Sequence, residues 1–143
     1  MCPKQFFLSL LILLFISQLT FSQRKVTELK SGWKFFKGNP DQACQAAFDD
    51  STWQSVSVPH DWAIEGPFIK EGDGNTGKLP WKGEGWYRKK LPLSDQDKGK
   101  RIYLLFDGVM AFPKVYVNGK LAGSWDYGYN SFYLDITELI QYG

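Results

Sequence analysis

The chain contains few of the residues that build disulfides or metal sites. It has two cysteines and a single histidine in 143 residues. Cys2 lies in an N-terminal segment expected to be removed, which leaves Cys44 without an internal disulfide partner. One Cys and one His, Cys44 and His60, do not make up a metal-ligand cluster. We expect Cys44 to be a small buried residue beside Ala43, Ala46 and Ala47.

An excess of charge of one sign is also missing. Seventeen Lys and Arg residues balance fifteen Asp and Glu residues, and the net charge at pH 7 is +2. The basic run Arg88-Lys89-Lys90 is short, and its side chains would alternate between the two faces of a strand. The sequence therefore predicts neither a nucleic-acid partner nor binding to an anionic membrane.

Long hydrophobic runs are absent beyond the N-terminus. The apolar segment 6–16 follows Lys4 and is shorter than the roughly 20 residues that cross a bilayer. Thr20 and Ser22 place small residues at −3 and −1 of a cleavage point before Gln23. These features predict a signal peptide over 1–22, a single domain over 23–143 and export to the periplasm or the extracellular space, with no membrane partner.

Helical periodicity is scarce, whereas aromatic residues and turn formers are abundant. Aromatics make up 17% of the chain, with 14 glycines and 7 prolines, a composition typical of an all-β sandwich. Asn118-Gly119 supplies two residues that accept positive φ, which predicts a type I′ hairpin over 112–125. Segment 101–107 is apolar on both faces and is predicted to lie centrally in a sheet. Segment 39–51 is the one helix-like piece, predicted to form one or two turns. Further strands are predicted at 30–37, 53–58, 86–93 and 131–134.

Residues 66–85 form a long loop with neither helical nor strand periodicity. Loops longer than roughly 12–15 residues without regular structure are usually functional or disordered. Phe68, Ile69, Leu79 and Trp81 argue against disorder, because disordered segments are poor in such residues. We therefore expect this loop to have a function.

The titratable residues do not form a recognisable catalytic group. His60 is next to Asp61, but no Ser or Cys nucleophile motif surrounds it. We expect both side chains to bond the local backbone at a Pro-His-Asp-Trp corner. Other carboxylates sit beside turn glycines and are predicted to be solvated: Glu65, Glu71, Asp73 and Glu84. No catalytic residue and no metal ligand is predicted.

Aromatic side chains could serve either the core or a sugar ligand. Three tryptophans in strand segments are assigned to the core: Trp33, Trp53 and Trp86. Trp81 lies in the long loop, and Tyr127 and Tyr129 flank Gly128 in a turn. For these three residues, contact with a ligand or with a neighbouring domain stays open beside a role in packing.

A set of short motifs runs through most of the chain after residue 30. Their order and spacing are more specific than any one of them. On these motifs the chain resembles the N-terminal β-sandwich of glycoside hydrolase family 2, the β-galactosidase and β-glucuronidase family. The motifs are Gly32-Trp33-Lys34-Phe35, Asp49-Asp50-Ser51 with Trp53, VPHDW at 58–62, GWYRK at 85–89, Phe106-Gly108-Val109, VYVNG at 115–119, Gly123 and Asp135-Ile136-Thr137.

The resemblance implies a jelly-roll sandwich of the galactose-binding type. In the family this domain precedes an immunoglobulin-like domain and a (β/α)8 barrel, which hydrolyses terminal β-linked sugars. Family domains usually continue past the Asp135-Ile136-Thr137 segment with a further strand, so the sandwich is expected to be incomplete at its C-terminal end. The expected partners are these downstream domains and a β-linked glycan, with homo-oligomerisation of the intact enzyme left open.

The resemblance also places the chemistry elsewhere. Family 2 enzymes carry both catalytic glutamates on the barrel, and no segment of this chain matches those motifs. The chain alone is therefore expected to be inactive and to bind no cofactor, with Mg²⁺ or Na⁺ belonging to barrel-side sites. β-Galactosidase is the favoured activity of the intact enzyme, and β-glucuronidase and β-mannosidase stay open. The alternatives are a free-standing carbohydrate-binding module without catalysis and a purely structural domain.

In the family, the loop before the Gly-x-Tyr motif can reach the barrel mouth. One branch, the enterobacterial-type β-galactosidases, uses an Asn three residues before that glycine. Lys82 occupies the position here, so that contact is not inherited. The length and composition of the loop still predict a role at the substrate rim. The candidates are Asn75, Lys78, Trp81 and Lys82.

Overall fold

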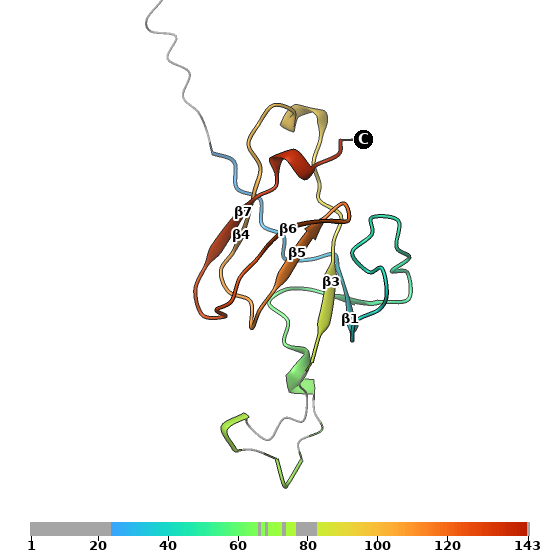
Figure 1. Ribbon diagram of the computed structural model, residues 1–143, viewed down its shortest axis with the longest axis vertical. Coiled ribbons are helices and arrows are strands. Elements are labelled where there is room, and N and C mark those ends of the chain that lie inside the picture. Colours follow the sequence, from blue (N-terminus) through green and yellow to red (C-terminus); the bar gives the residue numbers. More distant parts are fainter. Residues whose placement is uncertain (1–23, 66, 68, 73, 77–82, 143) are drawn as a thin grey trace, which may run out of the picture.

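The computed structural model describes residues 24–142, except 66, 68, 73 and 77–82 (Figure 1). The described residues form strands and short 3-10 helices and contain no α-helix, so the all-β prediction is confirmed. The strands are β1 (Trp33–Lys37), β2 (Gln54–Val56), β3 (Gly85–Arg88), β4 (Tyr103–Phe106), β5 (Lys114–Val117), β6 (Lys120–Ser124) and β7 (Phe132–Asp135). The 3-10 helices are η1 (Trp62–Glu65), η2 (Gly74–Thr76), η3 (Asp95–Asp97) and η4 (Thr137–Leu139).

The strands pair in three antiparallel groups. One sheet has the order β2-β1-β3, and β4 pairs with β7 and β5 with β6. Phe35 lies opposite Tyr87 in the first sheet, and Leu104 lies opposite Leu134 in the second. In Figure 1 the β4–β7 and β5–β6 pairs lie next to each other, with β3 and β1 beyond them.

Aromatic side chains fill the space between the strands. Phe35, Trp53 and Phe132 are each at most 6% exposed. The Trp86 ring stacks on Tyr116 at a centroid distance of 5.8 Å, which joins β3 to β5. Of the tryptophans predicted to be core, Trp53 is buried, whereas Trp33 and Trp86 are only half-buried.

The predicted hairpin is present between β5 and β6. Asn118 and Gly119 have φ values of 50° and 83°, as a type I′ turn requires. The Asn118 side-chain amide donates to the carbonyl of Leu139, 2.8 Å away, so the turn is also held to η4. The carboxylate of Asp135 accepts the Thr137 N–H at 3.0 Å, just before η4.

The prediction that segment 101–107 lies centrally in a sheet is wrong. Among the described residues, β4 pairs with β7 alone. Tyr103 and Leu105 on its outer face are 44% and 56% exposed. This outer face is apolar because Tyr103 packs on Tyr133 of the neighbouring strand, at 5.9 Å between ring centroids, and not because another strand covers it.

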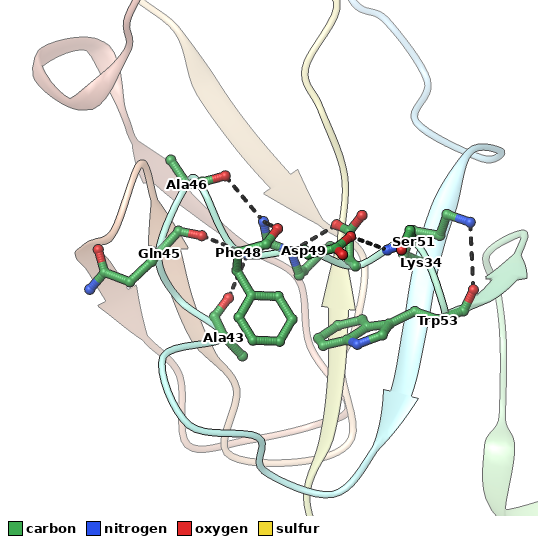
Figure 2. A network of polar contacts seen from close by, with 10 residues as sticks. Lys34, Ala43, Gln45, Ala46, Phe48, Asp49, Ser51 and Trp53 are labelled. Atoms are coloured by element: carbon green, nitrogen blue, oxygen red, sulfur yellow. Dashed lines mark hydrogen bonds and ion pairs between the residues drawn. The ribbon is translucent and has the colours of Figure 1, made fainter.

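Segment 39–51 is not helical either. It forms consecutive tight turns, with Ala43 N–H bonded to Pro40 O and Gln45 N–H bonded to Gln42 O. The Arg88 guanidinium, only 17% exposed, donates to the main-chain carbonyls of this segment. Several carbonyls of this segment accept hydrogen bonds from Arg88, and the apolar periodicity does not produce a helix. Figure 2 shows the carbonyl acceptors, which belong to Ala43, Gln45, Ala46 and Phe48.

The environment of Cys44 also differs from the prediction. Cys44 is half-buried, and Ala46 and Ala47 are exposed. Ala43, at 1% exposed, is the residue that fills the core at this point. Because the segment is a series of turns, its alanines do not share one buried face.

Candidate functional site at the root of the long loop

The long loop begins and ends at the β2-β1-β3 sheet. Its return strand starts at Gly85, which is paired with Lys37 at the end of β1. On the outgoing side, Val58 N–H donates to Lys30 O at 2.8 Å, and the chain then enters η1. Figure 1 shows η1 and η2 beyond the lower end of β3, away from the C-terminus. The sheet therefore sets the direction in which the loop leaves the domain.

Phe35 is the centre of an aromatic cluster at this root. Its ring centroid lies 4.9 Å from that of His60, 4.9 Å from that of Tyr87 and 6.2 Å from that of Trp62. A Cβ on Gly85 would stand 3.1 Å from Phe35 and 3.0 Å from the indole nitrogen of Trp62. The close approach of these rings to the backbone explains why glycine occupies position 85.

His60 and Tyr87 join the outgoing and returning arms of the loop. The His60 Nδ1 atom lies 2.8 Å from the Tyr87 hydroxyl, and that hydroxyl is 3.4 Å from the His60 carbonyl. The prediction that this imidazole bonds the local backbone is wrong, because its partner comes from β3, 27 residues away. The Asp61 carboxylate does bond the local backbone, accepting the Ala63 N–H at 3.0 Å, as predicted.

Burial and nearby carboxylates perturb the titration of Tyr87. Burial raises the pKa of Tyr87 to about 12, with further contributions from the carboxylates of Asp61 and Glu65. His60 Nε2 lies 3.9 Å from Glu65 Oε1. The Tyr87 hydroxyl therefore stays protonated, and it is available as a hydrogen-bond donor across the neutral pH range.

A lysine completes the root. The Lys37 ammonium lies 5.4 Å from the centre of the Trp62 ring, within the range of a cation–π interaction. Desolvation lowers the pKa of Lys37, and the Glu65 carboxylate opposes this shift. This arrangement suits the anchoring of a loop. It supplies no pair of nucleophile and base for a covalent step.

The predicted rim residues are only partly within the described structure. Asn75 lies in η2 and is exposed. Lys78, Trp81 and Lys82 lie outside the described residues. The sequence-based prediction missed the partners of the root, Phe35 and Lys37. No local motif marks these two residues. They could be found only from the pairing of β1 with its neighbours, which brings them to the VPHDW and GWYR motifs.

The two tyrosines left open by the sequence lie at another part of the surface. Tyr127 and Tyr129 are 59% and 77% exposed, with ring centroids 5.7 Å apart. Beside them is a hollow of about 350 Å³. It is lined by Ser124, Trp125, Asp126 and Tyr127.

Neither a membrane span nor a metal-ligand cluster occurs in the part of the chain that the structure describes. No helix there has the length and hydrophobicity to cross a bilayer. No three His, Cys, Asp or Glu side chains there are grouped so as to hold a metal ion.

The chain is similar to known glycosidases. A β-galactosidase of Bacteroides ovatus, BoGH2A, is 40% identical over 85% of this chain, which covers 14% of that protein. A putative β-glucuronidase of Formosa agariphila is 38% identical over 94% of this chain and 13% of its own length. The crystal structure of a Bacteroides uniformis β-glucuronidase superposes with a TM-score of 0.73 at 34% identity, over 84% of this chain and 13% of that chain.

The chain thus spans about one seventh of the length of these relatives. The family model described as the glycosyl hydrolase 2 galactose-binding domain-like domain matches residues 33–143. The resemblance seen in the motifs is confirmed by this match and by the shared structure. The chain belongs to glycoside hydrolase family 2, as its galactose-binding-like N-terminal domain.

Proposed function

We propose that this chain is the non-catalytic N-terminal domain of an exported, retaining glycosidase that hydrolyses terminal β-linked galactosides. The observation that carries the proposal is the match of nearly the whole chain to only about one seventh of long glycosidases, BoGH2A among them. The proposed partners of the domain are the immunoglobulin-like and barrel domains of the same polypeptide.

Four carboxylates among the described residues have structural roles, in keeping with the proposed non-catalytic role. Retaining glycosidases need two carboxyl groups about 5–5.5 Å apart, one as nucleophile and one as acid/base. Here Asp50 pairs with Arg88 at 2.9 Å, and Asp97 pairs with Lys100 at 3.0 Å. Asp61 and Asp135 accept backbone N–H groups. Each of these four carboxylates has a structural partner that accounts for its position.

The substrate assignment is tested with the intact protein that carries this chain. Its kcat/KM is compared on 4-nitrophenyl β-galactoside, β-glucuronide and β-mannoside. We expect the galactoside to be the best substrate and residues 23–143 expressed alone to hydrolyse none of the three. Higher kcat/KM on the glucuronide would overturn the sugar assignment. Hydrolysis by residues 23–143 alone would overturn the non-catalytic role.

The alternative, a carbohydrate-binding module without catalysis, is favoured by one observation. The exposed rings of Tyr127 and Tyr129 lie beside a hollow, as in an aromatic sugar platform. Under this alternative, the intact protein binds β-glycans and hydrolyses none of the three aryl glycosides. The same assay therefore separates the two functions.

Export is part of the proposal and has its own test. Segment 1–22, on which it rests, lies outside the described residues. Mass spectrometry of the mature protein should show Gln23 as the first residue, and fractionation should place the protein outside the cytoplasm. A mature protein that retains residues 1–22 would overturn this part of the proposal.

The root of the long loop suggests a second role for the domain, at the active site of the barrel in the intact enzyme. We propose that the clamp formed by Phe35, His60 and Tyr87 directs the loop toward the substrate rim of the intact enzyme. Asn75, exposed in η2, is the described residue that tests the idea, and Trp81 is the sequence-based candidate. Asn75→Ala and Trp81→Ala should each lower kcat/KM on the aryl galactoside. An unchanged kcat/KM in both variants would refute the rim role.

A further inference from the structure

Three aromatic rings form a column that ends at the protein surface. Phe106 of β4 stacks on Phe132 of β7, with centroids 4.8 Å apart and planes at 15°. Phe132, which is 4% exposed, stacks on Trp125 at 5.3 Å and 10°. Trp125 is 37% exposed and is the outer member of the column. Phe132 lies against one face of the indole.

The indole of Trp125 is fixed as well as exposed. Its Nε1–H donates to the Asn130 side-chain oxygen at 2.8 Å. Trp125 N–H also donates to Pro113 O at 3.1 Å, which ties the start of the turn to the link before β5. The orientation of the ring is therefore set before any ligand arrives, and this lowers the entropic cost of binding.

The turn that carries the neighbouring tyrosines is packed against the link between β4 and β5. A Cβ on Gly128 would stand 2.7 Å from the Met110 sulfur and 3.1 Å from the Met110 Cα. The backbones of Gly108 and Gly128 are just as close, since a Cβ on Gly108 would lie 3.0 Å from the Gly128 carbonyl oxygen. These close approaches pack the turn that carries Tyr127 against that link.

The hollow at this turn combines apolar rings with polar groups. Its volume is about 350 Å³, and its lining residues include Ser124, which has a hydroxyl, and Asp126, which has a carboxylate, beside Trp125 and Tyr127. Small-molecule sites measure about 300–1,000 Å³, so the hollow lies at the small end of that range. A flat ring surrounded by hydrogen-bonding groups matches a pyranose, which has an apolar face of C–H groups and a rim of hydroxyls.

We propose that Trp125 and Tyr127, with Ser124 and Asp126, bind one pyranose unit of a neutral β-linked glycan. The indole stacks on the apolar face of the sugar, and the carboxylate and hydroxyl groups accept and donate hydrogen bonds at its rim. The site is separate from hydrolysis and retains a glycan chain near the enzyme. The choice of galactose as the sugar rests on the proposed function.

A protein domain as the occupant is less favoured by the geometry. A stable protein–protein interface buries about 800 Å² on each partner and covers a broad surface. The hollow is lined by four residues, and an acidic side chain is one of them. The exposed carboxylate also disfavours an anionic sugar such as a uronic acid, because like charges repel.

Binding can be read at the site itself by hydroxyl-radical footprinting of the intact protein with mass spectrometry. The probe is β-1,4-galactotetraose, and Tyr133 is the internal reference, since it is 69% exposed on the outer face of β7. We expect the tetrasaccharide to lower oxidation of Trp125 and Tyr127 relative to Tyr133. Protection of the two residues without ligand would show that another part of the protein covers the hollow, and would overturn the proposal.

Variants test the same site by affinity. Tyr127→Ala and Trp125→Ala should each raise the Kd for the tetrasaccharide at this site at least about tenfold, whereas Tyr133→Ala should not change it. Trp125→Ala also removes a ring from the packed column, so the folding of this variant is checked by thermal melting. If Trp125→Ala is destabilised, the test relies on Tyr127→Ala. Unchanged Kd in the Tyr127 variant, or no saturable protection in the wild type, would overturn the proposal. Hydrolysis of the aryl galactoside by the wild type is measured in parallel, so failure of the proposed function is seen separately.

Discussion

The Nε atom of Arg88 lies 2.9 Å from Oδ2 of Asp50. Arg88 belongs to β3, and Asp50 lies near the end of segment 39–51, the series of turns found where a helix was predicted. The same guanidinium donates to carbonyls within that series and lies 5.4 Å from the centre of the Phe48 ring. One side chain therefore bonds to several points of this segment.

Arg88→Lys should loosen residues 40–50 while the charge is kept. A lysine ammonium cannot reproduce the planar set of donors that serves several carbonyls at once. Hydrogen bonds from charged groups contribute about 1.5–3 kcal/mol, so we expect local opening to become easier by about 2 kcal/mol. Hydrogen exchange of the amides of Ala43, Gln45 and Phe48 measures this change. Lys90→Ala, at an exposed neighbouring position, is the control. Equal exchange in Arg88→Lys and the wild type would contradict the role assigned to Arg88.

Gly85→Ala should disturb the root of the loop. The new Cβ would stand 3.0–3.1 Å from the rings of Trp62 and Phe35, which cannot yield as a flexible chain end does. We expect a loss of about 1–3 kcal/mol in the free energy of unfolding and a change in the near-ultraviolet circular dichroism of the aromatic cluster.

Gly74→Ala is the matched control for this substitution. A Cβ at Gly74 meets no heavy atom within 4 Å, and its φ lies outside the left-handed region. Its effect should stay within about 0.5 kcal/mol. Similar losses in the two alanine variants would contradict the steric explanation.

Tyr87→Phe should remove one pH-dependent contribution to stability. The folded-state pKa of Tyr87 is about 12, above its ordinary value of about 10. The folded protein therefore holds this proton more tightly than the unfolded chain does. The stabilisation is complete below pH 10 and is lost as the pH rises toward 12. The free energy of unfolding, measured in urea between pH 9 and 11.5, should fall less steeply with pH in the variant than in the wild type. The same slope in both proteins would rule out Tyr87 as the group responsible.

Gly119→Ala should weaken the β5–β6 hairpin. Gly119 has a φ of 83°, and an alanine there would place its Cβ 3.1 Å from Gln45 Oε1. A left-handed conformation costs a non-glycine residue about 1–2 kcal/mol, so the melting temperature should fall. Lys120→Ala, at an exposed strand position beside the turn, should leave the melting temperature almost unchanged. An unchanged melting temperature in Gly119→Ala would mean that the turn has another geometry.

Local features of the fold could be predicted from the sequence. Asn118-Gly119 determines its own turn, because positive φ depends on the two residues themselves. The strands follow from alternation, and the order of motifs such as VPHDW and GWYR led to the correct family. These inferences rely on neighbours in the chain, which the sequence displays directly.

Features that depend on distant partners could not be predicted. The apolar pattern of 39–51 suggested a helix, but its carbonyls bond to Arg88, more than 35 residues away. His60 was expected to bond its own backbone and instead meets Tyr87 of β3. The apolar outer face of β4 suggested a strand in the centre of a sheet. An aromatic pair across two strands gives the same apolar pattern in the sequence as a strand with neighbours on both sides.

The sequence by itself determined the all-β class, the hairpin and the membership of glycoside hydrolase family 2. Only the tertiary structure decided how the long loop is anchored and that Phe106, Phe132 and Trp125 stack into a column that reaches the surface. The physical reason is the range of the interactions. Turn and strand preferences arise within a few residues, whereas ring stacking and the Arg88 contacts form only after strands far apart in the chain have paired.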